Sequence, residues 1–408
     1  MGMNFLVGQS GGPTAVINSS LAGVYSTARQ YGAGKVYGMQ YGIQGLLQEK
    51  LVDLDQVLGS DLNIELLKRT PSSYLGSCRY KLPTPEQDEG VYQTLFSIFA
   101  KYAIDAVLYI GGNDSMDTIA KLSAYGSRIG SPIRFIGVPK TIDNDLMLTD
   151  HTPGFASAGK FIATVVKELI CDSNVYDLQS VTVAEIMGRH AGWLAACSSL
   201  AKSDDCDGPD LILLPEIAFC QDTFLAQVEK IRKQKNNIII AASEGVKTPE
   251  GVFLCDLMGE EGALDAFGHK AALSGTSRYL AGLIQKHLGC KTRAIELSTL
   301  QRCASHLTSR IDINESYQVG GAGVQAAIAG ETGRMSAIQR VSDAPYQSLC
   351  HTVDVQQVAN QEKVIPQDWI TADGTQLTDA FERYARPLIQ GEQLPIFVNG
   401  VPRHIRLQ

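Results

Sequence analysis

The chain has 408 residues, of which 35 are basic and 43 acidic, so its formal net charge is −8. Hydrophobic residues make up 44% and charged residues 19%, which is typical of a globular protein and excludes extensive disorder. The acidic balance argues against a nucleic-acid partner, because such a protein would show a basic stripe. The longest apolar runs have the length of strands, far below the roughly 18 residues of a membrane span, so we expect no membrane partner.

The cysteines and the first residues bear on the cellular compartment. The nine cysteines are scattered without a C-x-x-C pair, which is the pattern of reduced thiols. The chain enters an apolar strand almost at once, without the basic and apolar regions of a secretory signal. We therefore expect a cytoplasmic protein.

Segments typical of strands and of helices alternate along most of the chain. The first strand is expected at residues 4–8, and a turn over residues 9–14 opens a helix that continues to about Gln30. Further strands are predicted at residues 106–110, 134–138, 180–186, 211–214, 237–242 and 292–297. The clearest helical patterns are at residues 156–169, 224–233, 275–287 and 316–329. Because strands that alternate with helices form βαβ units, we expect an α/β fold with mainly parallel sheets.

Two glycine pairs follow predicted strands. Gly11 and Gly12 open the first helix, where backbone N–H groups and the helix N-terminus can approach an anion closely. A tight turn without a ligand is the alternative. Residues 111–115, Gly-Gly-Asn-Asp-Ser, repeat the pattern with more polar side chains. This second turn indicates either a phosphate or Mg²⁺–phosphate site, or a helix N-cap made by Asp114 or Ser115.

The segment PKTIDND, residues 139–145, is the most informative part of the sequence. It follows a predicted strand, and the end of a strand is where an open α/β sheet places its chemistry. In an extended chain, Asp143 and Asp145 would face the same pocket. Transfer of a phosphoryl group to an alcohol needs a carboxylate near the hydroxyl and cations around the moving group, which Lys140 would help to supply. The alternative is a turn rich in Asp and Asn without a catalytic role.

Other charged residues near strand ends fit the same chemistry. Arginine suits planar phosphate recognition, although single arginines more often form surface ion pairs. The candidate arginines are Arg79, Arg189, Arg293 and Arg302. Glu244 follows another strand and is placed to bind sugar hydroxyls, with a cap or a solvent-facing acid as the alternative. His190 is expected to be structural, and no histidine has the spacing of a zinc ligand.

Taken in chain order, these motifs resemble the 6-phosphofructokinase family. The likeness covers about the first 340 residues, and the IDND block at residues 142–145 is highly specific for that family. It implies two Rossmann-like lobes with the active site between them. The implied domains are a phosphoryl-donor lobe over residues 1–153, to which residues 301–345 return, a sugar-phosphate lobe over residues 154–300, and a C-terminal extension over residues 346–408 that packs on the lobes.

The resemblance also implies an activity and roles for individual residues. The activity is transfer of a phosphoryl group to the 1-hydroxyl of fructose 6-phosphate, a step of glycolysis and gluconeogenesis, with Asp143 as the general base and Arg189 stabilising the moving group. The implied catalytic residues are Asp143, Lys140, Arg189 and Asp114. The implied sugar-phosphate residues are Thr141, Asp145, Met187, Gly188, Glu244, Arg293, Thr299 and Arg302. The implied donor residues are Gly11, Gly12, Arg79, Gly112 and Ser115. The implied cofactor is Mg²⁺, with Asn113 at its site, and the implied assembly is a homodimer or homotetramer in which Arg293 reaches into a second subunit.

Two departures from the ATP-using members of the family concern the donor. Those members read GGDGS and PGTIDND, where this chain reads GGNDS and PKTIDND. Asp114 therefore replaces a glycine beside the α-phosphate of a nucleotide, and like charges about 4 Å apart repel by roughly 1–4 kcal/mol. Lys140 adds a cation where a pyrophosphate leaving group would collect charge. Both changes resemble the pyrophosphate-dependent branch, the diphosphate–fructose-6-phosphate 1-phosphotransferases.

Three further departures leave alternatives open. Asn113 replaces an aspartate that helps to hold Mg²⁺, so Asp114 or water is the alternative ligand. Ser180 replaces an arginine that crosses the subunit interface, and Thr299 replaces a histidine or tyrosine near the sugar, so sedoheptulose 7-phosphate is an alternative substrate. The alternative functions are an ATP-dependent kinase of the same fold and a non-catalytic sugar-phosphate sensor. The presence of both a base, Asp143, and cations argues against the sensor.

Overall fold

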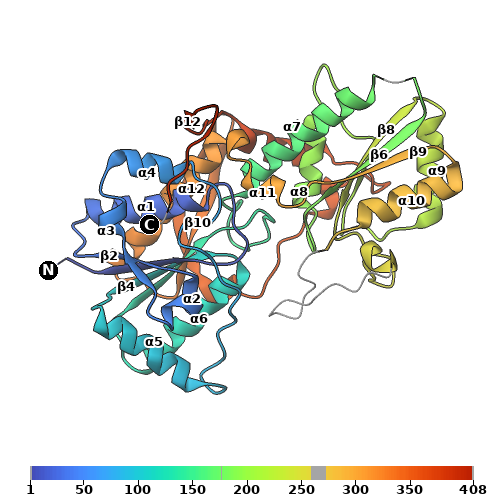
Figure 1. Ribbon diagram of the computed structural model, residues 1–408. Coiled ribbons are helices and arrows are strands. Elements are labelled where there is room, and N and C mark those ends of the chain that lie inside the picture. The colour runs from blue at the N-terminus through green and yellow to red at the C-terminus, as the bar shows by residue number, and fades with distance from the viewer. Residues whose placement is uncertain (1, 176, 259–272, 407–408) are drawn as a thin grey trace.

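The computed structural model describes residues 2–175, 177–258 and 273–406, which form two lobes, each built on a sheet covered by helices (Figure 1). The described strands of the first sheet lie in the order β11-β10-β5-β4-β1-β2-β3, and those of the second in the order β7-β8-β6-β9. A short hairpin, β12 (Phe397–Val398) and β13 (Val401–Pro402), lies near the C-terminus.

The first sheet is parallel at its centre and antiparallel at both edges, where β3 and β11 lie. Its strands are β1 (Phe5–Gln9), β2 (Val36–Met39), β3 (Leu51–Asp53), β4 (Ala106–Gly111), β5 (Arg134–Pro139), β10 (Arg334–Asp343) and β11 (Tyr346–Asp354). Helices α1 (Ile17–Gln30) and α12 (Arg310–Ile328) cover one face, and α5 (Glu89–Lys101) and α6 (Asn113–Arg128) cover the other. Smaller helices are α2 (Gly42–Leu46), α3 (Leu54–Val57) and α4 (Asp61–Lys68).

Side-chain alternation explains why both faces of this sheet are covered. In β4, Leu108 and Ile110 pack in the cluster that includes α1 and α12, whereas Val107 and Tyr109 pack in the cluster that includes α5 and α6. Successive strand residues point to opposite faces, so a strand that is apolar throughout needs helices on both sides.

The second sheet is parallel throughout its described strands, β6 (Ser180–Ile186), β7 (Leu211–Leu213), β8 (Asn237–Ser243) and β9 (Lys291–Glu296). One face packs against α7 (Phe155–Ser173) and α8 (Trp193–Ala196), and the other against α9 (Gln221–Arg232) and α10 (Thr276–Leu288). A one-turn helix, α11 (Leu300–Cys303), follows β9 on the way back to α12. Among the described residues, no helix combines the length and the apolarity that a membrane crossing needs.

The C-terminal segment after β11 runs across both lobes (Figure 1). It contains α13 (Asp379–Ala385) and contacts the second sheet, where the N–H of Ile212 donates to the carbonyl of Thr375 at 2.8 Å. It ends against the first lobe, where the N–H of Ile405 donates to Oγ1 of Thr70 at 3.1 Å. The segment therefore holds the two lobes together.

The predicted strands and helices are confirmed to within a few residues, apart from two helices. The N-terminal helix was predicted to begin at the turn and begins at Ile17, and the helix predicted at residues 316–329 begins at Arg310. The sequence analysis missed strands β2, β3, β10, β11, β12 and β13 and helices α2 to α5, α8, α11 and α13, and for α6 it named an N-cap only as an alternative. The first sheet draws strands from residues 5–139 and 334–354, and the second from residues 180–296. The predicted domain boundaries themselves stay a prediction. All nine cysteines are free thiols, as expected.

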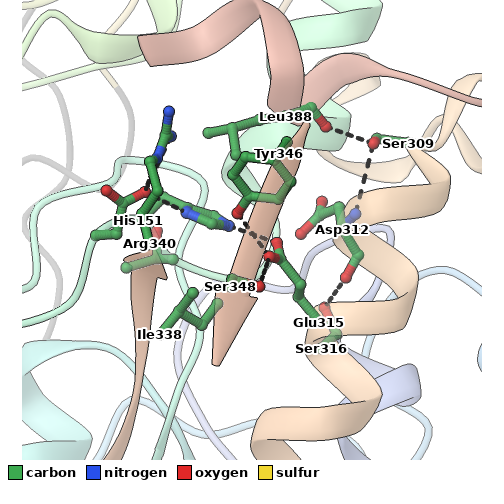
Figure 2. A network of polar contacts seen from close by, with 12 residues as sticks. His151, Ser309, Asp312, Glu315, Ser316, Ile338, Arg340, Tyr346, Ser348 and Leu388 are labelled. Carbon is green, nitrogen blue, oxygen red and sulfur yellow. Dashed lines mark hydrogen bonds and ion pairs between the residues drawn. The ribbon is translucent and has the colours of Figure 1, made fainter. Parts of the chain in front are cut away.

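A buried polar network joins the loop after β5 to α12 and to the β10–β11 hairpin (Figure 2). His151 is fully buried; its Nδ1 lies 2.8 Å from a carboxylate oxygen of Asp150, and its Nε2 lies 2.7 Å from one of Glu315. Glu315 also accepts a hydrogen bond from the hydroxyl of Tyr346 at 2.6 Å, and Arg340 pairs with Asp150 at 3.0 Å. Burial disfavours the charged imidazole, but the two carboxylates outweigh it and raise the pKa of His151 to about 9.

We expect His151 to make stability depend on pH. Because its folded pKa lies above its ordinary value of 6.5, its contribution is complete below about pH 6.5 and is lost as the pH rises through about 9. A shift of this size corresponds to roughly 3 kcal/mol. The free energy of unfolding can be measured with urea at pH 6 and pH 9.5 for the wild type and for His151→Gln. The gap between the two proteins should be narrower at the higher pH. A gap that stays constant would contradict this assignment.

Candidate active site

The site is built around the loop that follows β5. Its two ends are tied together, because the N–H of Thr141 donates to the carbonyl of Pro153 at 3.2 Å and Oγ1 of Thr152 donates to the carbonyl of Thr141 at 2.8 Å. Inside the loop, the N–H of Asp143 donates to Oγ1 of Thr141 at 3.1 Å, and Asn144 has a left-handed backbone with φ of 55°. The expected extended chain is therefore wrong, since the aspartates lie in a turn. They are nevertheless close enough to interact electrostatically.

Lys140 occupies the centre of this charge cluster. Its side chain is only 3% exposed, and burial lowers the pKa of Lys140 to about 8 against the opposing effect of Asp143 and Asp145. Burial raises the pKa of Asp143, with Lys140 as the main opposing charge. Burial and the neighbouring Asp143 raise the pKa of Asp145 to about 7. Buried acids and a buried base with pKa values displaced toward neutrality are typical of functional sites.

The glycine turn after β1 lies against two of the cations. Gly11 has a φ of 76°, and a Cβ atom placed on it would lie 3.2 Å from Nζ of Lys140. A Cβ atom on Gly12 would lie 3.1 Å from Nη1 of Arg302. The turn is fixed by Ser77, whose hydroxyl donates to the carbonyl of Gly11 at 2.6 Å. The backbone of the turn thus lies against the two cations, and a side chain on either glycine would contact one of them.

The second glycine pair forms the start of α6. Gly112 is the N-cap, and Asp114 lies in the first turn of the helix. The alternative in which Asp114 or Ser115 caps the helix is therefore wrong. Asp114 is exposed and is one of the charges that raise the pKa of Lys140, so the two side chains are neighbours. Oδ1 of Asn113 is buried and accepts no hydrogen bond from the described residues.

The second sheet contributes from the ends of β6 and β8. The N–H of Gly188 lies 3.4 Å from Oε1 of Glu244, and the N–H of Met187 donates to the side chain of Gln301 at 3.2 Å. Burial raises the pKa of Glu244 to about 8, and the next cause is the charge of Asp143. The carboxyl ends of strands from both sheets therefore face one another across the site, which is the usual place for ligands in α/β proteins.

Arginines complete the cluster. Arg189, directly after Gly188, lowers the pKa of Asp143. Arg302 on α11 is partly buried, and burial together with Arg79 lowers its pKa. Arg302 was expected among the residues that bind the sugar phosphate, and Arg79 among those that bind the donor. Because Arg79 acts on Arg302, Arg302 lies between the two groups of expected residues.

Two of the expected residues lie apart from the cluster. The side chain of Arg293 is half exposed and pairs with Asp172 of α7 at 3.6 Å. Thr299 is exposed and immediately precedes α11. Within a single chain, neither is drawn into the charge cluster around Asp143.

Sequence reasoning missed several residues that support the site. Gln301 is 2% exposed and braces the backbone at Met187. Asn144 is fully buried and is bound by Tyr384 and Lys363 from the C-terminal segment. The IDND block could have drawn attention to Asn144, but nothing in the sequence links it to residues more than 200 positions away.

The arrangement suits transfer of an anionic group. Three cationic side chains, Lys140, Arg302 and Arg189, act on the carboxylate of Asp143, whose pKa burial raises, so the site can bind phosphates and remove a proton. Among the described residues, no three or more His, Cys, Asp and Glu side chains are grouped as a metal site. Mg²⁺ often takes only one or two protein ligands and completes its shell with phosphates and water. Asn113 and the carboxylates of Asp114 and Asp143 offer oxygen ligands of that kind.

Comparison with known proteins identifies the relatives of this chain. The sequence model of the family described as Phosphofructokinase matches residues 4–327. The chain is 42% identical to a pyrophosphate--fructose 6-phosphate 1-phosphotransferase from Halomonas elongata, covering 99% of this chain and 96% of that protein. It is 30% identical to a sulfofructose kinase from Alkalicoccus urumqiensis, with coverage of 90% and 92%. A pyrophosphate-dependent phosphofructokinase structure from Nitrosospira multiformis superposes with a TM-score of 0.89 at 39% identity, covering 99% and 96% of the two chains.

We expect the two glycines of the first turn to differ in their tolerance of a side chain. Gly11→Ala places a Cβ atom on a left-handed backbone and against Lys140, so it should lower the free energy of unfolding by roughly 1–2 kcal/mol. In Gly12→Ala, the flexible end of Arg302 can move away, so the loss should stay below about 0.5 kcal/mol. Urea unfolding midpoints of the two variants test this order, and the reverse order would refute it.

Proposed function

Because this chain belongs to the phosphofructokinase family, we propose that it transfers a phosphoryl group from pyrophosphate to the 1-hydroxyl of fructose 6-phosphate. The products are fructose 1,6-bisphosphate and orthophosphate, and the reaction is reversible. The observation that carries the proposal is the buried ammonium of Lys140, which lies between the Gly11 turn and the two aspartates of the loop.

Lys140 and Asp114 together favour a compact inorganic donor. Lys140 can neutralise charge on the departing phosphate, where a positioned cation is most effective. Asp114 puts a carboxylate in the first turn of α6, beside the helix N-terminus that would otherwise receive a further phosphate. A nucleotide must place its α-phosphate near this carboxylate, whereas pyrophosphate has no third phosphate to place. The 42% identical relative carries pyrophosphate in its name, which supports the same donor.

Asp143 is the proposed general base. Its carboxylate takes the proton of the sugar 1-hydroxyl while the hydroxyl oxygen bonds to the transferred phosphorus and the bond from that phosphorus to the bridging oxygen breaks. Burial raises the pKa of Asp143, which makes its carboxylate a stronger base, and the charge of Lys140 opposes this shift. Arg189 acts on the equatorial oxygens of the moving group.

The second sheet is proposed to hold the sugar. Glu244 and the N–H of Gly188 lie together at the ends of β8 and β6, where a carboxylate and a backbone donor can bind neighbouring hydroxyls. Arg302 supplies a guanidinium for phosphate. Arg293 faces outward from the strand β9, as a residue that serves a second subunit would, so we propose a homodimer or homotetramer. Mg²⁺ is the proposed cofactor, held by the donor phosphates with Asn113 and Asp114 close by, and it would neutralise phosphate charge. The proposed location is the cytoplasm.

Initial rates with each donor test the proposal. At fixed Mg²⁺ and fructose 6-phosphate, kcat/KM with pyrophosphate should exceed that with ATP by at least about fivefold, the lower bound set by a carboxylate–phosphate repulsion of roughly 1 kcal/mol. Sedoheptulose 7-phosphate offered in place of fructose 6-phosphate should react more slowly. Faster turnover with ATP would assign the chain to the ATP-dependent kinases instead.

We expect the Asp114→Gly, Lys140→Gly double variant to lose its donor preference. Removal of the Lys140 cation should lower kcat/KM for pyrophosphate by about 100-fold or more, and removal of the carboxylate should increase the use of ATP. The matched control is the Asp117→Ala, Lys121→Ala double variant, because this ion pair of 2.6 Å lies one turn further along α6. An unchanged ratio of pyrophosphate to ATP rates in the Asp114, Lys140 variant would refute the roles of both residues.

A further inference from the structure

The loop that carries the catalytic aspartates is held through a single buried amide. Asn144 is fully buried and left-handed, and it lies between the two aspartates. Its Nδ2 donates to the hydroxyl of Tyr384 at 2.9 Å, and its Oδ1 accepts from the N–H of Thr152 at 3.1 Å. Nζ of Lys363 lies 3.4 Å from the same Oδ1. Two of these three partners come from the C-terminal segment.

Lys363 contacts both ends of the loop. Its ammonium donates to the carbonyl of Asp150 at 2.8 Å and to that of Thr149 at 3.1 Å, while its backbone N–H donates to the carbonyl of Asp145 at 2.8 Å. Its own carbonyl accepts from Nε1 of Trp193 at 2.8 Å, which anchors it on the second lobe. Burial lowers the pKa of Lys363 to about 8, so it is mostly charged at neutral pH and can bind three oxygens at once.

Tyr384 supplies the second fixed point. Its hydroxyl donates to the carbonyl of Asp150 at 2.7 Å while it accepts from Asn144. Its ring packs against Trp369 and Trp193, with centroid distances of 5.2 and 5.5 Å. Since aromatic packing restricts the ring, the hydroxyl oxygen is a rigid reference for the loop.

We propose that Lys363 and Tyr384 are positioning residues for the phosphoryl transfer, which keep Asn144 left-handed and thereby orient Asp143 toward the reacting hydroxyl. The hydrogen bonds of both side chains go to Asn144 and to loop carbonyls and not to the carboxylates of the cluster, although the charge of Lys363 also acts on Asp145, so both residues act on Asp143 through the loop. Asparagine tolerates the left-handed region better than most non-glycine residues, and the hydrogen bonds to both ends of its side-chain amide fix Asn144 in that conformation. Displacement of a catalytic group by about 1 Å can cost 100-fold in rate. The inference rests on the proposed function, because it assigns Asp143 the role of base.

Both positioning residues lie outside residues 4–327, the stretch that the phosphofructokinase family model matches. The part of the chain that the family pattern does not describe therefore takes part in organising the catalytic loop. This gives the C-terminal segment a task in the reaction in addition to its packing on the two lobes.

The test measures kcat and KM separately for the variants Lys363→Met and Tyr384→Phe. We expect kcat to fall by about tenfold or more in each, with KM for both substrates changed by less than about twofold, because a displaced base slows only the chemical step. Hydrogen exchange should also be faster at the amides of residues 141–152.

The matched control is Arg386→Met. Arg386 belongs to the same C-terminal segment and donates to the carbonyls of Leu200 at 2.9 Å and Lys202 at 3.2 Å, but not to the loop. The control should lower the unfolding midpoint, as the other variants do, while kcat stays within about twofold of the wild type.

A kcat for Lys363→Met and Tyr384→Phe equal to that of the control, or a raised KM with unchanged kcat, would overturn the positioning role. If Lys363→Met does not fold, Tyr384→Phe decides, since it removes a single oxygen atom. A wild type that transfers nothing from pyrophosphate would instead defeat the proposed donor. The same kinetic split and the exchange of the loop amides would then be measured with the donor that the wild type does use.

Discussion

The burial of the Lys140 ammonium among carboxylates is the interaction on which the rest of the site depends. A lysine that is 3% exposed would normally lose its proton, and burial lowers its pKa to about 8. The opposing effect comes mainly from Asp143 and Asp145, so the lysine and the aspartates each offset part of the cost of burying the other's charge. This mutual dependence fixes their spacing, because a cation or an anion left alone at such a site is strongly destabilised.

Backbone geometry makes that spacing possible. The loop bends around Asn144, so the two aspartates project from a bent loop and not from an extended strand. Gly11 approaches Lys140 from the first strand with a backbone that only glycine adopts freely. Each of these special conformations lies at the end of a parallel strand, where the regular hydrogen bonds of the sheet stop and the chain is free to bend.

The sequence predicted the charged residues of the site better than the residues that hold them in position. Strands such as β4 and β5 were predictable because parallel strands buried on both faces are apolar throughout, and the residues directly after them were then natural candidates. Short edge strands such as β3 have only three residues and carry little periodic signal. The left-handed Asn144 was not predictable from alternation, which assumes an extended chain. The role of Lys363 could not be predicted, because it arises from a contact between residues more than 200 positions apart, and no local sequence pattern indicates such a contact.

The site brings like charges close together, and bound substrates would offset the repulsion between them. Burial lowers the pKa of Arg302 and the neighbouring Arg79 lowers it further, while burial raises the pKa of Glu244 and the charge of Asp143 raises it further. Phosphate groups between the arginines would relieve the first repulsion, and a sugar hydroxyl that donates to Glu244 would relieve the second. The C-terminal segment is anchored on both lobes and so holds the two halves of the site together. Ligands that neutralise these charges would therefore offset part of the cost of burying them.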